Sequence, residues 1–157
     1  MTGYALVEAG PGSNPVCRVA GEIRPKPTWP LAQRLAAVFE GLDRIIVEHG
    51  PLEMAVEDIF FAKNARSALA LGHVRGVALL AAARHGLPVA TYSANAIKKS
   101  VVGYGRASKD QVGRMVCSLL SLREMPGPDV TDALACAVCH LNSSATDLRI
   151  RAALGKR

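Results

Sequence analysis

Three acidic residues have the types and spacing of a metal-binding cluster. Asp129 and Asp132 lie three residues apart, and Glu57 ends the apolar segment Met-Ala-Val-Glu. Acids at positions i and i+3 of a helix share one face, and a carboxylate after buried residues is costly unless it reaches water, a partner or a cation. Oxygen ligands without matching histidines or thiolates suit Mg²⁺, or Mn²⁺, better than Zn²⁺. Two such ions hold the attacking water and the leaving oxygen in phosphodiester hydrolysis.

A structural interpretation of the same acids stays open. Asp129 and Asp132 fall where a helix should begin, and helix starts favour acidic caps and negative charge. Glu57 is harder to explain in this way, because the end of a strand beside a helix N-terminus is where open mixed sheets bind ligands.

The elements that must position these acids alternate between strands and helices after an initial hairpin. The patterns predict strands at 2–8, 16–23, 52–57 and 88–92 and helices at 31–48, 64–85, 94–102, 108–120 and 129–141. Ser93 is the expected cap of one helix, and Ser108 with Gln111 fits a capping box for the next. The order predicts an α/β fold, a mixed sheet flanked by helices.

The composition indicates one compact domain. The chain has 157 residues, 50% of them hydrophobic, and a formal net charge of +6, which suits a nucleic-acid partner without requiring one. We assign residues 1–142 to this domain and 143–157 to a basic, frayed C-terminal tail. The start lacks the features of a signal peptide, and the longest apolar run, 76–83, is too short for a membrane span. We therefore expect a soluble cytoplasmic protein that has no membrane partner and keeps its four cysteines reduced.

Cys136, Cys139 and His140 match the spacing of a haem-attachment motif. The motif lies inside an apolar helical pattern and no export signal precedes it, so we interpret these residues as core or helix-surface residues. No haem is expected. The other histidines show no metal-ligand spacing.

Basic residues gather around a glycine-containing loop at 103–108. Lys98, Lys99, Arg106 and Lys109 flank this loop, whose backbone could approach a phosphate closely. A solvated basic surface is the alternative, and Gly103 would then only end a helix. Phe60 and Phe61 follow the acid strand, and such an aromatic pair could simply anchor the following helix.

The sequence resembles the RuvC family of bacterial Holliday-junction resolvases, which have an RNase H-like fold. The resemblance is carried by Thr-Gly-Tyr at 2–4, AVEDIFFAKNARSALALGHVRG at 55–76, IKKSVVGYGRASKDQV at 97–112 and DVTDALACAVCH at 129–140. It implies magnesium-dependent cleavage of four-way junction DNA in recombination and repair. In this reading the metal ligands are Glu57, Asp129 and Asp132, the catalytic lysines are Lys98 and Lys109, and the DNA-binding residues are Phe60, Lys63, Lys99 and Arg106.

The resemblance also implies partners. The family acts as a symmetric homodimer and works with the RuvA–RuvB branch-migration complex. The row Ala68, Gly72, Gly76 and Leu80 would allow close approach of a second subunit, or of the chain's own sheet.

One family acid has no counterpart in the sequence. The family carries a fourth aspartate in a strand ending Gly-Ile-Asp-Pro-Gly, which would precede Met1 and supply a central strand. We therefore expect the first strand and the first metal-binding aspartate to lie upstream of Met1. The alternative function is a catalytically inactive junction-binding protein or fragment.

Overall fold

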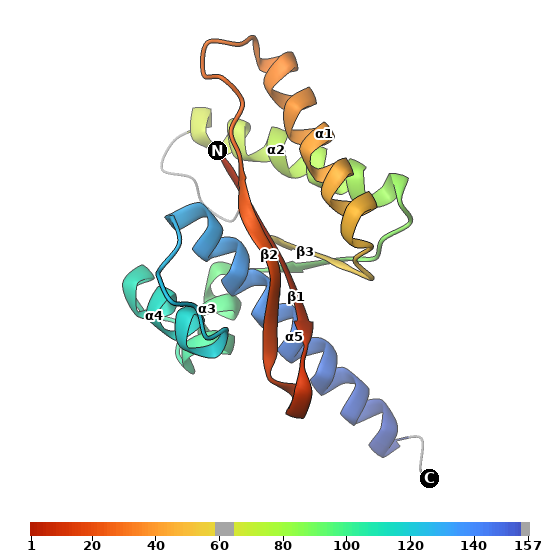
Figure 1. The fold of residues 1–157 in the computed structure, drawn as a ribbon, viewed down its shortest axis with the longest axis vertical. Helices are drawn as coiled ribbons and strands as arrows, with labels where there is room; N and C mark the ends of the chain where they lie inside the picture. The colour runs from red at the N-terminus through yellow and green to blue at the C-terminus, as the bar shows by residue number, and fades with distance from the viewer. Residues whose placement is uncertain (59–64, 155–157) are drawn as a thin grey trace.

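The structure is a computed structural model that describes residues 1–58 and 65–154. Two layers of helices enclose two pairs of strands (Figure 1). The strands are β1 (Thr2–Ala9), β2 (Pro15–Ile23), β3 (Met54–Glu57) and β4 (Val89–Tyr92). The helices are α1 (Leu31–His49), α2 (Ala65–Arg84), α3 (Ala94–Val102), α4 (Lys109–Leu119) and α5 (Pro128–Leu154), with a short 3-10 turn, Pro11–Ser13, in the first hairpin.

The strands form two separate ladders. β1 and β2 pair antiparallel, with an irregularity between Leu6 and Val7. β3 and β4 pair parallel because α2 returns the chain to the same end of the sheet, and this register sets Glu57 opposite Tyr92. The expected mixed sheet therefore appears within the described residues as two ladders that no hydrogen-bonded strand joins. The prediction of a mixed α/β fold is confirmed.

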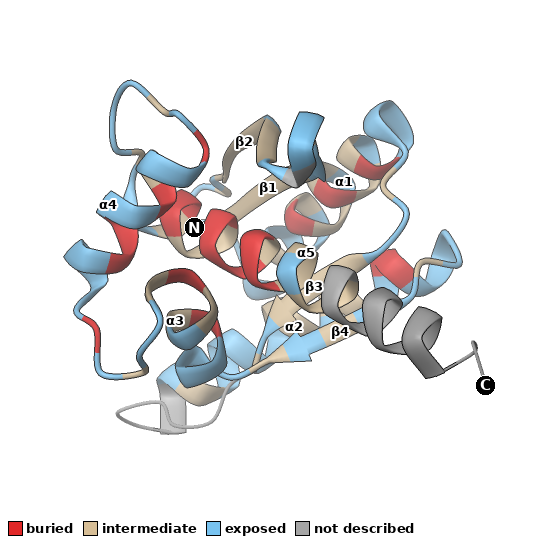
Figure 2. Cartoon of the chain, turned by 90° about the horizontal axis from the view of Figure 1, so that it is seen from below, coloured by how far each residue is buried: buried red, intermediate tan, exposed pale blue. Residues whose placement is uncertain are grey.

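Two apolar clusters hold the ladders between the helices. The larger contains buried residues of α3, α4 and α5, with Leu134 and Val116 fully buried, and strand residues such as Ala5 and Ala55 pack against it. The smaller joins α1 to α2 through Val38 and Ala81. In Figure 2 the buried residues follow one side of α5 and of its neighbours. Helix α5 therefore passes through the centre of the domain and contacts both ladders.

Local end signals explain most helix boundaries. The Ser93 hydroxyl accepts a hydrogen bond from the backbone of Ala96, and Ser108 with Gln111 forms the complete capping box. Gly103 ends α3 in the left-handed conformation, with φ of 89°. These three predictions are confirmed.

The predicted end of the last helix is wrong. Helix α5 does not stop at Leu141 but continues to Leu154. The sequence from Leu141 to Leu154 contains neither glycine nor proline, and the Ser143 hydroxyl donates to the Cys139 carbonyl one turn earlier, within the helix. The helix continues because nothing in this polar segment breaks a helix.

Candidate active site

Glu57 lies at the carboxyl end of β3, where the strand leaves the core. The side chain is exposed, whereas the three strand residues before it are half-buried. The next backbone amide, of Asp58, donates to the Tyr92 carbonyl at 2.7 Å and extends the parallel ladder past Glu57. Arg75 on α2 supports the same strand ends, since it donates to the Thr91 hydroxyl at 3.1 Å and lies 3.8 Å from an Asp58 oxygen. The position of Glu57 is therefore fixed by its neighbours on both strands.

Asp129 and Asp132 both lie in the first turn and a half of α5, as the sequence predicted. The hydroxyl of Thr131, between them, is buried and donates to the Pro126 carbonyl at 3.1 Å, and its backbone amide donates to Gly127 at 2.9 Å. These bonds fix the start of the helix, so both half-buried acids project from a rigid element.

Gly3 allows β1 to lie directly against that helix start. A methyl group built on Gly3 would lie 2.0 Å from the Asp129 carbonyl oxygen, far inside van der Waals contact. Only glycine therefore fits where the hairpin meets the acids. The sequence reasoning assigned no role to Gly3, although Thr-Gly-Tyr was part of the family resemblance; the contact joins residues far apart in the chain and leaves no local signal.

Lys109 links the acids to α4. The capping box sets Lys109 in the first turn, and its ammonium donates to Asp132 Oδ2 at 2.7 Å. This hydrogen bond is the main cause that raises the pKa of Lys109, and the negative charges of Asp132, Glu57 and Asp129 raise it further, against partial burial. One ammonium group therefore lies within the electrostatic reach of all three predicted acids.

Glu57 shares this environment. Partial desolvation is the largest cause that raises the pKa of Glu57, and the negative charge of Asp132 raises it further. Lys109 and then Lys98, on α3, lower the same pKa and partly offset the increase. The structure thus brings together five residues proposed from the sequence, namely Glu57, Lys98, Lys109, Asp129 and Asp132.

The remaining predicted site residues are not part of this cluster. Lys99 and Arg106 are exposed, and in the described part of the chain neither forms an ion pair with the acids. Phe60 and Lys63 lie outside the described residues. Across residues 1–58 and 65–154, no three histidine, cysteine, aspartate or glutamate side chains form a group that could hold a metal ion. The three acids share a local field without forming a closed coordination shell.

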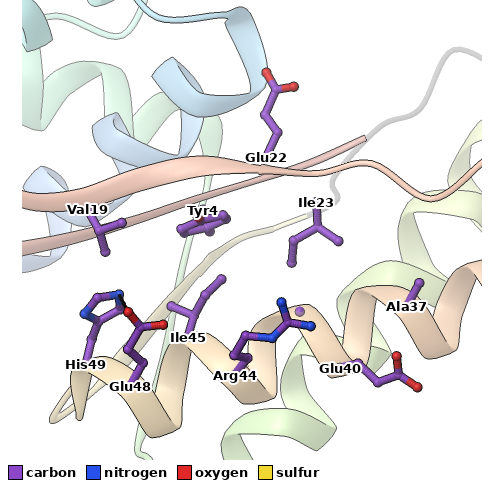
Figure 3. Close-up of a pocket in the computed structure, with 11 residues that line it drawn as sticks. Tyr4, Val19, Glu22, Ile23, Ala37, Glu40, Arg44, Ile45, Glu48 and His49 are labelled. Atoms are coloured by element: carbon purple, nitrogen blue, oxygen red, sulfur yellow. Dashed lines mark ion pairs between the residues drawn. The ribbon is translucent and has the colours of Figure 1, made fainter.

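A cavity of about 510 Å³ lies between the hairpin and α1 (Figure 3). Tyr4 and Ile23 of the hairpin face Arg44 and His49 of α1 across it. Among the described residues, none of the site residues proposed from the sequence lines this cavity.

The cysteine motif belongs to the core. Cys136 is 6% exposed and Cys139 is 2% exposed, which confirms their interpretation as core residues. Burial is the main cause that raises the pKa of Cys136 to about 12, with smaller contributions from Cys139 and Glu57. Both sulfur atoms are therefore protonated at neutral pH and pack as apolar groups. None of the helices in the described residues is long and apolar enough to cross a membrane.

A cluster of carboxylates offset by lysines, on an α/β fold with an overall positive charge, suits an enzyme that hydrolyses phosphodiesters in nucleic acids. Comparison with known proteins makes the assignment specific. The family model of the crossover junction endodeoxyribonuclease RuvC matches residues 1–140. The chain belongs to the RuvC family, and its relatives are enzymes of that name.

Curated relatives match nearly the whole chain. The crossover junction endodeoxyribonuclease RuvC of Koribacter versatilis is 51% identical over 152 residues, which cover 96% of this chain and 92% of the relative. The protein of the same name from Syntrophotalea carbinolica is 50% identical over 140 residues, covering 89% and 86%.

Solved structures share the fold. The structure of T. thermophilus RuvC in complex with a Holliday junction substrate has a TM-score of 0.85 and 27% identity, over 91% of this chain and 87% of that one. A second Thermus thermophilus RuvC structure has a TM-score of 0.81 and 28% identity, with the same coverage. The mixed α/β architecture is therefore that of RuvC, an RNase H-like fold.

Proposed function

We propose that this chain is a divalent-metal-dependent endonuclease that resolves four-way DNA junctions by paired phosphodiester cleavage in recombination and repair. The observation that carries the proposal is the contact of Lys109 with Asp132, within the field of Glu57 and Asp129. The Thermus relative, described as bound to a Holliday junction substrate, supports the choice of substrate.

The chemistry of the donor set suits a hard cation, although within the described residues the three acids alone do not form a group that could hold a metal ion. All three acids offer oxygen ligands, and the Lys109 ammonium already compensates the negative charge of Asp132. Glu57, Asp129 and Asp132 would hold Mg²⁺, with Mn²⁺ as a substitute, and the ion would supply charge stabilisation at the phosphate and an activated water. The Cys136 thiol is unsuited to this role, because it stays protonated and buried.

The lysines have a separate task. Lys109 and Lys98 come from two different helices, and the positive charge of each lowers the pKa of Glu57. Positive charge fixed beside the acids would stabilise the negative charge that develops on the phosphate oxygens. Lys99 on α3 and Arg106 in the loop 103–108 are exposed, and there they would bind the DNA backbone. Phe60 and Lys63 are the other two residues of the proposed DNA-binding set.

The test is cleavage of a synthetic four-way junction with and without Mg²⁺. The chain should cut the junction only with metal and should leave a linear duplex of the same sequence intact. Glu57→Gln should slow cleavage by about 10²-fold or more while junction affinity, measured in Ca²⁺, changes little. Glu48→Gln, an exposed acid on α1, is the matched control and should retain full activity. Equal cleavage by both variants would exclude Glu57 from the reaction.

We also propose a homodimer that forms through α2. A row of small residues on this helix is open, since a methyl group built on Gly72 or Gly76 meets nothing within 4 Å among the described atoms, and Leu80 is 55% exposed. Close approach of a second subunit would cover this row. Sedimentation velocity should give a dimer for the parent and a monomer for Leu80→Glu, whereas Val47→Glu, 70% exposed on α1, should leave the dimer intact.

A fourth carboxylate on an additional strand is the last part of the proposal. The β1–β2 and β3–β4 ladders pack on the same helix without hydrogen bonds between them in the described residues, so a strand set between β1 and β3 would pair with both. An added N-terminal segment of the Gly-Ile-Asp-Pro-Gly type should raise both the cleavage rate and the melting temperature. The same segment with Asn in place of Asp should raise only the melting temperature, and a segment with neither effect contradicts the proposal.

Cooperation with a RuvA–RuvB branch-migration complex and a cytoplasmic location follow from the same family assignment. A junction preassembled with RuvA and RuvB should be cut at least as fast as the free junction. The comparisons do not favour an inactive junction-binding protein, and the cleavage assay tests that alternative directly.

A further inference from the structure

His140 connects helix α5 to both strands of the parallel ladder. Its Nδ1 lies 2.8 Å from the Tyr92 hydroxyl and its Nε2 lies 2.7 Å from Glu53 Oε2. Tyr92 ends β4, and Glu53 immediately precedes β3. The imidazole is 18% exposed, compared with 49% for the Glu53 side chain, so the bond to Tyr92 is partly buried whereas the bond to Glu53 is exposed.

The chemistry of these partners assigns the hydrogen bonds. An ionised carboxylate only accepts, so Nε2 carries a proton and donates to Glu53. In the neutral ring Nδ1 then accepts from the Tyr92 hydroxyl. The rings of Tyr92 and His140 also meet at 5.7 Å between centroids, tilted by 56°. The three side chains therefore form one directed chain, Tyr92 to His140 to Glu53.

These hydrogen bonds connect the strand end that carries Glu57 with the helix that carries Asp129 and Asp132. Tyr92 lies opposite Glu57 in the ladder, and its carbonyl accepts from the amide that follows Glu57. His140 lies on the same helix as Asp132, about two turns further along. A bond between His140 and Tyr92 consequently fixes the helix that carries two acids against the strands that carry the third.

We propose that His140 is a positioning residue that sets the separation of Glu57 from Asp129 and Asp132 through its bond to Tyr92. The proposal rests on the function proposed above. A misplacement of about 1 Å, even one caused far from the reacting atoms, can slow a reaction by about 10²-fold. Loss of the Tyr92 bond frees the helix from the Glu57 end of the ladder, whereas loss of the Glu53 bond frees it only from the opposite end of β3.

The experiment separates the two bonds. Tyr92→Phe removes one hydroxyl, and His140→Gln places its amide near the former Nε2, so that only the Glu53 bond survives. His140→Asn places its amide near the former Nδ1, so that only the Tyr92 bond survives. We expect Tyr92→Phe and His140→Gln to reduce the single-turnover cleavage rate by about tenfold or more, whereas His140→Asn and Glu53→Gln retain most of it. Junction affinity in Ca²⁺ should stay within about twofold of the parent.

Each other outcome overturns the inference. Equal cleavage by Tyr92→Phe and the parent would show that the bond to Tyr92 does not position the acids. A lower melting temperature with an unchanged cleavage rate of the folded protein would mean a purely structural role, and weaker junction binding with an unchanged rate would mean a binding role. Equal losses for His140→Asn and His140→Gln would also contradict the assignment to Tyr92. A parent chain that cleaves no junction would instead overturn the proposed function, and this inference with it.

Discussion

Replacing Lys109 with methionine should separate the chemistry of the site from the stability of the fold. Lys109 donates to Asp132 at 2.7 Å, and their side chains are 76% and 41% exposed. Exposed ion pairs contribute about 0.2–1 kcal/mol to stability because water and salt screen them. For a chain of this size, 1 kcal/mol corresponds to about 2–4 °C, so Lys109→Met should lower the melting temperature by less than about 4 °C.

The expected effect on cleavage is much larger. A positive charge next to a developing negative charge acts mainly in the transition state, and loss of one such group costs about 2.7–4 kcal/mol, or about 10²–10³-fold. The solvent exposure of Lys109 favours the lower end, about 10²-fold. Lys109 also lowers the pKa of Glu57, so its loss should raise that pKa. The cleavage rate, which should increase with pH as Glu57 loses its proton, should then increase at a higher pH than in the parent.

The chain provides a matched control on the same helix. Arg114 pairs with Asp110 at 2.8 Å, with side chains 75% and 62% exposed. Arg114→Met should cost the same small stability as Lys109→Met and leave the single-turnover cleavage rate unchanged. The reasoning fails if the two variants cleave at equal rates, or if the loss in Lys109→Met appears entirely as weaker junction binding in Ca²⁺.

The remaining predictions concern packing and charge at the same site. Leu134→Ala should lower the free energy of unfolding in a denaturant titration by about 2–5 kcal/mol, because the side chain is fully buried, and a loss below about 1 kcal/mol would contradict the described core. Gly3→Ala should cost about 1–3 kcal/mol in the same titration, because its methyl group would meet the Asp129 carbonyl. In metal-free buffer Glu57→Gln should raise the melting temperature at neutral pH, since a raised folded pKa means that the ionised form opposes folding. This gain should disappear as the pH falls below the ordinary value of 4.5, and a gain independent of pH would exclude desolvation as its cause.

The sequence predicted those parts of the structure that depend on neighbouring residues. The capping box at Ser108 and the left-handed Gly103 are local signals. The helices that begin or end at these residues lie within a few residues of their predicted positions. The three acids could also be predicted from local sequence, because an acidic pair at i and i+3 and an acid after an apolar strand are recognisable without knowledge of the fold. Their closeness was expected from the order of strand and helix ends.

What could not be predicted depends on contacts between distant segments. The fit of Gly3 against Asp129 and the hydrogen bond from Tyr92 to His140 each join separate elements, so no spacing in the sequence reveals them. The division of the strands into two ladders could not be predicted either, because strand propensity says which segments are extended and not which edges meet.

The geometry explains why so much of the buried surface gathers around one helix. Carboxylates placed beside one another oppose folding, as the raised pKa of Glu57 indicates, and the lysines offset this only partly. The surrounding structure must therefore hold Asp132 in place against its repulsion from Glu57. Helix α5 does so through the fully buried Leu134 and Val138, just after the acids. Because one element supplies both the core and two of the three acids, a substitution that loosens its packing should reduce cleavage before it unfolds the protein.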